Sequence, residues 1–401
     1  LVAAMPEAEY NLGVFDTYVE DHGAAAFAVF KVGGGIVDEP DNLSAFAEST
    51  AEVRRLGFTP VIVHGGGPQI DAALEDAGIK SQRVEGLRVT TKEGLEVTER
   101  VLLKVGQTIV DSLWNRDIES ETLMGVIDAE PIDRATYGEV GRVTGVNIDR
   151  IADVVKWGSI PVVSCLGKTP SGNTLNVNAD DSAAAVVRAL RPLKYVSMTS
   201  TGGVRSGDGS LMRVLTPEII AGLKGDGVVN GGMQKKVDEA LGLLGEGVVK
   251  DVVIVDPKHL LSELFTHEGY GTLITNGETL REYGREDIGG ADRAKIRRLI
   301  ESAFDGKRLP DDYFDRTDIS RLLITSQRYD GVGIFTVPED EVLAGADIEY
   351  LDKLAVSDVA RGRGVAQQIV ETAAREKGIF WRCSPDNPYR RKYEENADGW
   401  E

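Results

Sequence analysis

The region from about residue 27 to 275 alternates apolar strands with amphipathic helices, and this alternation constrains the fold more than any other feature. Short apolar runs, among them "AFAVFKV", "PVIVHGG", "SIPVVSC" and "VKDVVIVD", alternate with segments of helical spacing. Such a pattern predicts an α/β domain with a mainly parallel open sheet sandwiched by helices. Because ligands of these sheets bind at the carboxyl ends of the strands, we expect functional residues in the loops at that edge.

Two of these loops are glycine triplets that directly follow strands. "KVGGG" at 31–35 places Lys31 before one triplet, and "HGGGPQ" at 64–69 places Pro68 after the other. Neither has the spacing of a P-loop or of a GxGxxG dinucleotide turn. Proline suits the first turn of a helix, where free backbone N–H groups attract anions, and glycine lets a ligand approach. The alternative is a tight turn without a ligand, but such a turn does not need three consecutive glycines.

Two later segments add charged and amide side chains. "TLNVNADD" places Asn176, Asn178 and Asp180 at the start of a helix, and "GGMQKK" places Lys235 and Lys236 after a glycine pair. Phosphoryl transfer needs such groups, because two anionic partners must be positioned while the charge on the moving phosphoryl group is neutralised. No obvious histidine or aspartate stands ready to deprotonate an alcohol. This favours an acceptor that is already ionised, such as a carboxylate.

The motifs "KVGGG", "HGGGPQ", "EGLRVT", "NVNAD" and "GGMQKK" follow one another in this order, and residues 27–275 thereby resemble the amino-acid kinase family, in particular its N-acetylglutamate kinases. The resemblance implies ATP with Mg²⁺ as cofactor, N-acetylglutamate as acceptor and no tightly bound protein metal. It further implies that Lys31 and Lys236 flank the transferring phosphoryl group and that Asp180 holds these lysines in place.

The same resemblance assigns contacts to the two substrates. Gly66 and Gly67 would donate N–H groups to the acceptor, while Arg88, Asn176 and Asn178 would bind its carboxylate and acetamido groups. The expected nucleotide-binding residues are Gly33, Gly34, Thr201 and Gly202. In the loop "MTSTGGV", Ser200 and Thr201 stand where such kinases commonly carry an aspartate. Taken singly, each residue has a structural alternative: a solvated surface charge for a lysine, an ion pair for Arg88.

The stretch "KHLLSELFTHEGYGTLIT" resembles the arginine-responsive signature of these kinases. Two carboxylates in it could bind a guanidinium, and a glycine turn offers backbone groups to an amino acid. The resemblance implies that the arginine-binding residues are His259, Glu263, Glu268, Gly269 and Gly271. The alternative is a helix cap and turn that only close the domain.

The region from 291 to 401 changes pattern: a basic helix near "ADRAKIRRLIESAF" precedes strands at "RLLITS", "GVGIFTV" and "IEYLDKLAV" and a helix at 362–377. The turn "RGRGVA" before that last helix is basic and glycine-rich, which suits a pyrophosphate, although a basic helix cap is the alternative. The turn resembles the acetyl-CoA loop of GNAT-type acetyltransferases, and "YLDKLAV" with "FWRCSPDNP" narrows the resemblance to the acetyltransferase domains of vertebrate-like N-acetylglutamate synthases. The acetyl-CoA ligands implied are Arg361, Gly362, Arg363, Gly364 and Ala366.

In that family the amine of L-glutamate attacks the thioester directly. The resemblance implies that Lys353 and Tyr393 form the catalytic pair and that Arg382 and Asn387 hold glutamate. A tyrosine hydroxyl, with an ordinary pKa of about 10, can protonate the departing thiolate. The chain stops at "DGWE", and the domain is expected to lack its last strand.

The predicted organisation is an N-terminal helix (1–26), an amino-acid kinase domain (27–275), a polar linker (276–290) and a smaller α+β acetyltransferase domain (291–401). The two activities are consecutive, so the prediction is a bifunctional enzyme of arginine biosynthesis, arginine-regulated and tetrameric. One alternative is a synthase whose kinase-like domain only binds arginine, and another is a non-enzymatic arginine sensor. Lys31, Asp180 and Lys236 argue against the first of these alternatives.

Composition excludes several other classes. The net charge of −20 argues against nucleic-acid or anionic-membrane partners. Two cysteines are too few for a disulfide framework or a metal cluster. No apolar run approaches the roughly 18 residues of a membrane span, and the first residues lack a secretory pattern. A cytoplasmic protein is therefore the expectation.

Overall fold

The computed structural model describes residues 28–265, 270–304, 306–325, 329–338, 347–357, 360 and 364–383. The chain divides into two compact units between Asn276 and Gly277. The expected helix at 1–26 lies outside the described residues.

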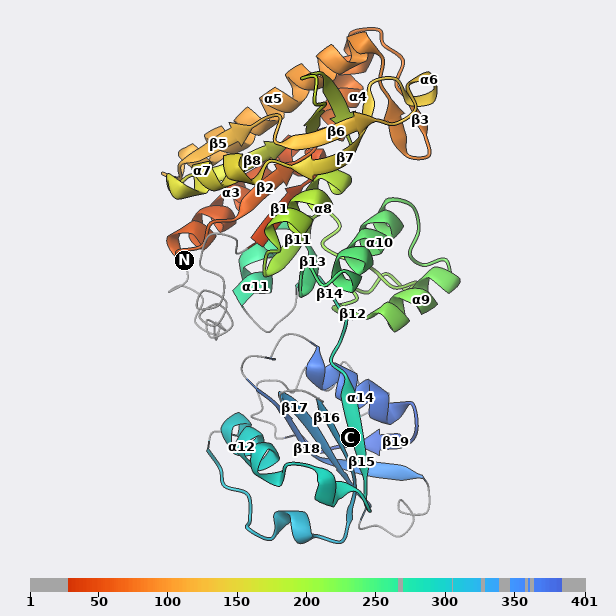
Figure 1. Ribbon diagram of the computed structural model, residues 1–401. Coiled ribbons are helices and arrows are strands. Elements are labelled where there is room, and N and C mark those ends of the chain that lie inside the picture. Colours follow the sequence, from red (N-terminus) through yellow and green to blue (C-terminus); the bar gives the residue numbers. More distant parts are fainter. Residues whose placement is uncertain are drawn as a thin grey trace. The chain divides into compact units, whose positions relative to one another are not determined.

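Unit 1 is built on an eight-stranded sheet of order β12-β14-β13-β11-β1-β2-β8-β5 (Figure 1). Its strands are β1 Ala28–Val32, β2 Val61–His64, β5 Ser120–Leu123, β8 Ile160–Ser164, β11 Lys194–Met198, β12 Val214–Leu215, β13 Asp251–Val255 and β14 Thr272–Thr275. Neighbours pair in parallel except for β13 with β14. Lys31 is in register with Val63 and Ser197, so β1, β2 and β11 end at the same edge. The predicted mainly parallel sheet is confirmed.

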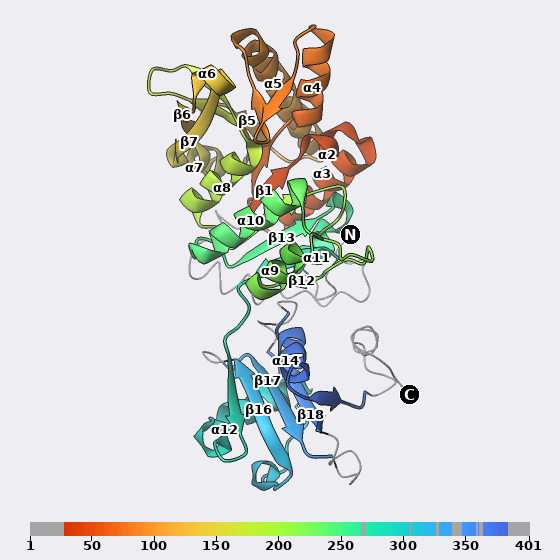
Figure 2. The ribbon, with the colours of Figure 1, turned by 90° about the vertical axis from the view of Figure 1, so that its right-hand side faces the viewer.

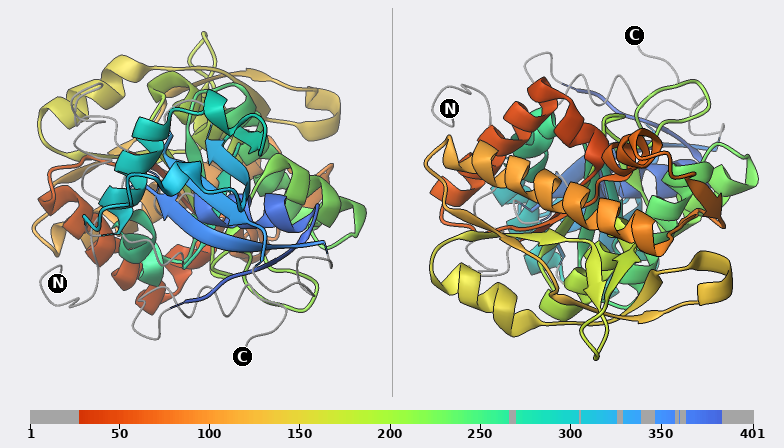
Figure 3. Two further views of the ribbon diagram at one scale, coloured as in Figure 1. Left: turned by 90° about the horizontal axis from the view of Figure 1, so that it is seen from below. Right: turned by 90° about the horizontal axis from the view of Figure 1, so that it is seen from above.

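Helices cover both faces of this sheet because successive strand residues point to opposite sides. Phe30 packs in one hydrophobic cluster with residues of α3 and α5, whereas Val29 packs in another with residues of α8 and α10. Figure 3 shows α3 and α5 side by side, in red and orange, and Figure 2 shows α8 beside α10, in green. The helices are α2 Gly34–Asp38, α3 Pro40–Arg55, α4 Gly67–Asp76, α5 Lys92–Trp114, α6 Arg134–Tyr137, α7 Ile148–Lys156, α8 Ala179–Leu190, α9 Pro217–Gly225, α10 Gly231–Gly245, α11 Leu260–Phe265 and the 3₁₀ helix η3 Pro257–His259.

Two small β elements supplement the sheet. One is a closed barrel of order β10-β7-β6-β9, and the other is the hairpin of β3 and β4. Their bounds are β3 Gln82–Val84, β4 Leu87–Val89, β6 Ile127–Pro131, β7 Val140–Val146, β9 Leu166–Lys168 and β10 Thr174–Val177. Leu175 and Val177 of β10 are buried in the barrel core with Ala129, so β10 is anchored where the chain enters α8.

Unit 2 is a five-stranded sheet of order β15-β16-β17-β18-β19, antiparallel except for β18 with β19. Its elements are β15 Leu280–Gly284, η4 Ile288–Gly290, α12 Arg293–Ala303, η5 Tyr313–Asp315, β16 Ile319–Thr325, β17 Gly331–Thr336, β18 Ile348–Val356, α14 Val365–Ala374 and β19 Gly378–Phe380. Ile296 of α12 packs in one core cluster and Ile369 of α14 in another. The predicted strands and helices of a smaller α+β domain are confirmed.

The predicted linker at 276–290 is wrong for residues 280–284 and 288–290, which form β15 and η4. Residues 280–284 form β15, which pairs with β16 from Leu280↔Thr325 to Gly284↔Arg321. Tyr283 is buried in the core of unit 2. The composition was misleading because β15 is an edge strand, which carries charged side chains such as Arg281 and Glu282 outward.

No helix in the described part of the chain has the length and apolar character needed to cross a membrane.

Candidate active sites

Three predicted catalytic residues of unit 1 meet in one cluster. Lys31 is the last residue but one of β1, Asp180 lies in the first turn of α8, and Lys236 lies on α10. One carboxylate oxygen, Asp180 Oδ1, accepts from Lys31 Nζ at 2.6 Å and from Lys236 Nζ at 3.2 Å. Lys235 points elsewhere, with its Nζ 3.6 Å from Asp181 Oδ1 and its side chain half-exposed. The two adjacent lysines therefore have different partners, and only Lys236 contacts Asp180.

The glycines at the end of β2 differ in what they make room for. A Cβ on Gly65 would lie 2.9 Å from the Cβ of Ala179, and one on Gly66 would lie 3.0 Å from Leu102. Gly65 therefore lets the start of α8 approach β2, which brings Asp180 to Lys31. Gly67 has no neighbour within 4 Å of such a Cβ and faces open space. Of the three, Gly67 has the free approach expected of a ligand-binding glycine.

The electrostatics of the lysine cluster follow from burial and shared charge. Burial would lower the pKa of Lys31, but the adjacent Asp180 carboxylate raises it above its ordinary value. Burial and then the charge of Lys31 lower the pKa of Lys236. Burial would raise the pKa of Asp180, yet the two ammonium groups hold it well below its usual range. With both lysines charged, the cluster carries one net positive charge.

Glu239 is a further member of this site that the sequence analysis missed. It lies one helical turn after Lys236 on α10, and burial, followed by the charges of Asp180 and Asp181, raises its pKa to about 8. Its Oε1 atom is buried and has no hydrogen-bond partner among the described residues. The i, i+3 spacing from Lys236 was the available signal, because such residues share a helix face.

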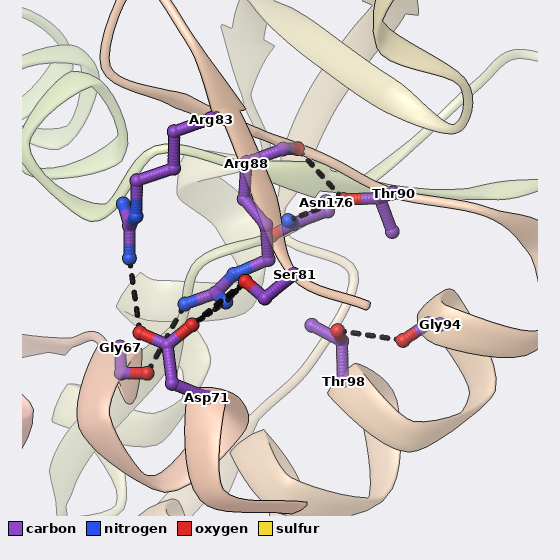
Figure 4. A network of polar contacts seen from close by, with 9 residues as sticks. All are labelled: Gly67, Asp71, Ser81, Arg83, Arg88, Thr90, Gly94, Thr98 and Asn176. Atoms are coloured by element: carbon purple, nitrogen blue, oxygen red, sulfur yellow. Dashed lines mark hydrogen bonds and ion pairs between the residues drawn. The ribbon is translucent and has the colours of Figure 1, made fainter. Parts of the chain in front are cut away.

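The predicted carboxylate ligand Arg88 is held in a polar network (Figure 4). Its Nη1 donates to Asp71 Oδ1 and, at 2.7 Å, to Ser81 Oγ, while its Nη2 donates to Gly67 O at 3.1 Å. Arg83 contacts the second oxygen of Asp71 at 3.1 Å. The hydrogen bond from Arg88 lowers the pKa of Asp71 to about 2. These contacts leave Nε–H and one N–H of Nη2 of Arg88 without a partner among the described residues.

The two predicted asparagines have different environments. Asn176 donates from Nδ2 to Thr90 Oγ1 at 2.9 Å, and Thr90 Oγ1 donates to Arg88 O at 2.9 Å (Figure 4). Asn178 caps α8, since its Oδ1 accepts from the backbone N–H of Asp180 at 2.8 Å. The capping oxygen of Asn178 is thus occupied, and its expected substrate contact stays a prediction that rests on its Nδ2.

The predicted nucleotide residues lie in two loops at the same strand edge. Gly33 precedes α2 as its N-cap, and a Cβ on Gly34 would lie 2.9 Å from Cδ of the rigid Pro68 ring. Thr201 Oγ1 lies 2.6 Å from Thr199 Oγ1, and Gly202 has a φ of 74°. The close packing of the two glycine turns therefore favours glycine at position 34, independently of any contact with a nucleotide.

The segment predicted to bind arginine is only partly described, because Glu268 and Gly269 lie outside the described residues. His259 stacks on Tyr270 with ring centroids 4.9 Å apart, and its Nδ1 lies 2.8 Å from Asp256 Oδ2. Glu263 Oε2 accepts from the backbone N–H groups of Tyr270 and Gly271, both at 2.8 Å. Glu263 thus uses one oxygen to bind the backbone of Tyr270 and Gly271, a contact that fits the alternative in which this segment only closes the domain.

In unit 2 the predicted catalytic Lys353 belongs to a cluster around Asp352 on β18. Asp352 Oδ2 accepts from Tyr313 Oη, from Arg316 Nη1 at 3.2 Å and from Lys353 Nζ at 3.2 Å. The Lys353 ammonium also lies 5.7 Å from the ring centre of Tyr313. Burial, followed by the hydrogen bond to Asp352, raises the pKa of Tyr313. The position of the lysine is therefore set by its neighbour Asp352 and by Tyr313.

Other predicted residues of unit 2 are described unevenly. Gly364, with a φ of 76°, is the N-cap of α14, and Ala366 lies in the first turn. Arg382 is exposed. The predicted residues Arg361, Gly362, Arg363, Asn387 and Tyr393 lie outside the described residues. Among the described residues, no group of three or more His, Cys, Asp or Glu side chains is placed to hold a metal ion.

The fold and the clusters define a transferase with two domains, one of the kinase class and one of the acetyltransferase class. Residues 26–256 match the amino acid kinase family, and residues 277–400 match the N-acetyltransferase of N-acetylglutamate synthase. The chain belongs to the amino acid kinase family and carries a fused N-acetyltransferase domain.

Similar proteins cover nearly the whole chain. An acetylglutamate kinase of Xanthomonas campestris is 37% identical over 382 residues, which cover 94% of this chain and 87% of that protein. The mitochondrial bifunctional protein argC of Dictyostelium discoideum is 32% identical over 370 residues, 89% of this chain and 42% of that protein. N-acetylglutamate synthase of Neisseria gonorrhoeae, solved with coenzyme A and L-arginine, has a related fold, with a TM-score of 0.64 at 20% identity over 97% of this chain and 95% of that chain.

Proposed function

We propose that the protein is a bifunctional enzyme of arginine biosynthesis, which acetylates L-glutamate with acetyl-CoA and phosphorylates the resulting N-acetylglutamate with ATP. The observation that carries the kinase half is the pair of lysines, Lys31 buried and Lys236 half-buried, that share Asp180 at the carboxyl end of β1. The acetyltransferase half is supported by the fused domain and by the cluster around Lys353. The product of one domain is the substrate of the other.

In the kinase domain, Lys31 and Lys236 neutralise negative charge as the phosphoryl group moves between two anions. The acceptor carboxylate has an ordinary pKa of about 4.3, so it is ionised at neutral pH and needs no general base. Arg88 and Asn176 bind the rest of the acceptor, and Gly67 offers its backbone N–H. ATP would be held by Gly33, Gly34, Thr201 and Gly202. Bound together with Mg²⁺, ATP supplies the phosphoryl group.

In the acetyltransferase domain, Lys353 and Tyr393 form the catalytic pair beside the glutamate amine and the thioester. Arg382 and Asn387 hold glutamate. The turn that ends at Gly364 and Ala366 would hold acetyl-CoA, which supplies the acetyl group as a thioester. Tyr393 gives its hydroxyl proton to the departing thiolate. Asp352 and Tyr313 keep the Lys353 ammonium in place.

Regulation, assembly and location are further parts of the proposal. The Neisseria gonorrhoeae relative was solved with L-arginine, which supports an arginine site at His259, Glu263, Glu268, Gly269 and Gly271 here. A homotetramer and a cytoplasmic location are inferred from the family resemblance and from the sequence pattern. Light scattering and cell fractionation test them.

The competing function is a synthase whose kinase-like domain only binds arginine. Two assays on one purified sample separate the functions: ADP formation with N-acetylglutamate, and CoA release with glutamate. We expect both activities. CoA release without ADP formation would establish the competing function, and an arginine-induced shift in melting temperature with neither activity would indicate a non-enzymatic sensor.

A further inference from the structure

Thr90 connects the two residues that are proposed to bind the acceptor substrate. It follows β4, is 2% exposed, and its backbone pairs with Gly138. Its hydroxyl lies 2.9 Å from Arg88 O and 2.9 Å from Asn176 Nδ2, as Figure 4 shows. Thr90 thus bridges the strand that carries Arg88 and the strand, β10, that carries Asn176.

The hydroxyl fixes which end of the Asn176 amide faces Thr90. A threonine hydroxyl has one proton and can accept further hydrogen bonds. Because that proton is donated to Arg88 O, the partner on Asn176 must be a donor, which is Nδ2. The other end of the amide, Oδ1, then points away from Thr90, and it has no hydrogen-bond partner among the described residues. Asn176 therefore offers an acceptor to a ligand.

Asn176 lies on the chain segment that leads from β10 to the lysine cluster. Asn176 is followed on the same chain segment by Asn178, which caps α8, and by Asp180, which holds the two lysines. The guanidinium of Arg88 binds Gly67 O at the start of α4. The hydrogen bonds of Thr90 therefore connect Arg88, whose guanidinium can bind a carboxylate, with Asn176, whose Oδ1 can accept from an N–H group.

We propose that Thr90 is a specificity-determining positioning residue, which orients Asn176 so that its Oδ1 accepts the amide N–H of an acylamino dicarboxylate. The inference rests on the proposed kinase function and adds Thr90 as the residue that orients Asn176. A substrate of the same shape that lacks this N–H leaves Asn176 Oδ1 without a hydrogen bond when it binds. Loss of one such hydrogen bond in a buried site lowers affinity by about 10- to 100-fold.

The test compares N-acetylglutamate with 2-acetoxyglutarate, in which an ester oxygen replaces the N–H while charge and shape are kept. The measured quantity is the ratio of kcat/KM for the amide to kcat/KM for the ester. We expect wild type to prefer the amide by about 10- to 100-fold. Thr90→Val, which is nearly isosteric and lacks the hydroxyl, should reduce the ratio to within a few-fold of one, mainly through KM for the amide.

Two further variants keep the inference falsifiable. Thr90→Ser retains the hydroxyl and should restore the preference, whereas Asn176→Ala removes the acceptor and should abolish it even if Thr90→Val does not fold. An unchanged ratio in folded Thr90→Val, or in Asn176→Ala, would overturn the specificity role. A wild-type protein that forms no ADP with either acceptor would instead overturn the kinase function on which the inference rests, and the specificity role with it.

Discussion

Glu239 makes the stability of the kinase domain depend on pH between pH 4.5 and about 8. Its pKa in the folded protein is about 8, against an ordinary value of 4.5. A group whose folded pKa is raised contributes stability that is fully present below pH 4.5 and is lost as the pH rises through about 8. Glu239→Gln, which stays neutral, should therefore become more stable relative to wild type over this range.

The size of the effect follows from the shift in pKa. Each unit corresponds to about 1.4 kcal/mol, so a shift from 4.5 to about 8 amounts to at most roughly 5 kcal/mol above pH 8. Water that enters around the ionised carboxylate reduces this, so we expect about 2–4 kcal/mol. The groups that act on Glu239 are Asp180 and Asp181 of α8, which disfavour its ionisation, and Lys31 and Lys236, which favour it.

Calorimetric unfolding of wild type and Glu239→Gln between pH 5 and 9 measures this difference, with Asp238→Asn as the matched control. Asp238 is the preceding residue on α10, is exposed and pairs with Lys224. The melting temperature of the kinase domain should diverge between wild type and Glu239→Gln as the pH rises, and not for the control. A constant difference across the range would refute the assignment of a buried, proton-holding carboxylate.

Three other predictions concern single sites. Lys236→Ala should lower the rate of N-acetylglutamate phosphorylation by about 100-fold or more because a preorganised cation is lost, whereas Lys235→Ala should not lower it. An ADP assay that gives the same rate for Lys236→Ala and wild type would place Lys236 outside the site. Millimolar arginine should raise the melting temperature, and Glu268→Ala should reduce that shift; an unchanged melting curve would remove the arginine site. Tyr313→Phe should lower kcat for CoA release several-fold and leave ADP formation unaffected, because Asp352 loses a hydrogen-bond donor and Lys353 loses its fixed position. Undiminished CoA release would show that Tyr313 does not position Lys353.

The sequence was sufficient for the features that repeat or that lie next to one another along the chain. Alternating apolar runs predicted the parallel sheet, and strand-glycine turns predicted its functional edge. Lys31, Asp180 and Lys236 could be assigned by motif order, although they come from three separate elements. The roles of Tyr393 and Asn387 stay predictions, because these residues lie outside the described part of the chain.

What could not be predicted depends on contacts between distant segments. The pairing of β15 with β16 gives structure to a polar stretch that has no strand-like composition of its own. The raised pKa of Glu239 depends on its burial beside Asp180, and the orientation of Asn176 depends on a hydroxyl 86 positions away. Each is a property of the folded environment, so local spacing gives at most a hint of it.

Buried and half-buried cations in the two units differ in how far their charge is compensated, and this difference distinguishes a binding site from a structural ion pair. In unit 2, Arg321 is 4% exposed and lies within 2.6 Å of carboxylate oxygens of both Glu349 and Glu376, with Ala373 O accepting a third bond. Its charge is more than compensated, which marks it as a group that holds β16, β18 and α14 together. In unit 1, Lys31 and Lys236 share the single carboxylate of Asp180. Buried charge without full compensation is unfavourable, so this pair is stabilised further when an anion binds. The lysine cluster has less negative than positive charge, and this is the physical reason to place phosphoryl transfer there. Arg321 has no such deficit of negative charge, and we therefore assign it to the core.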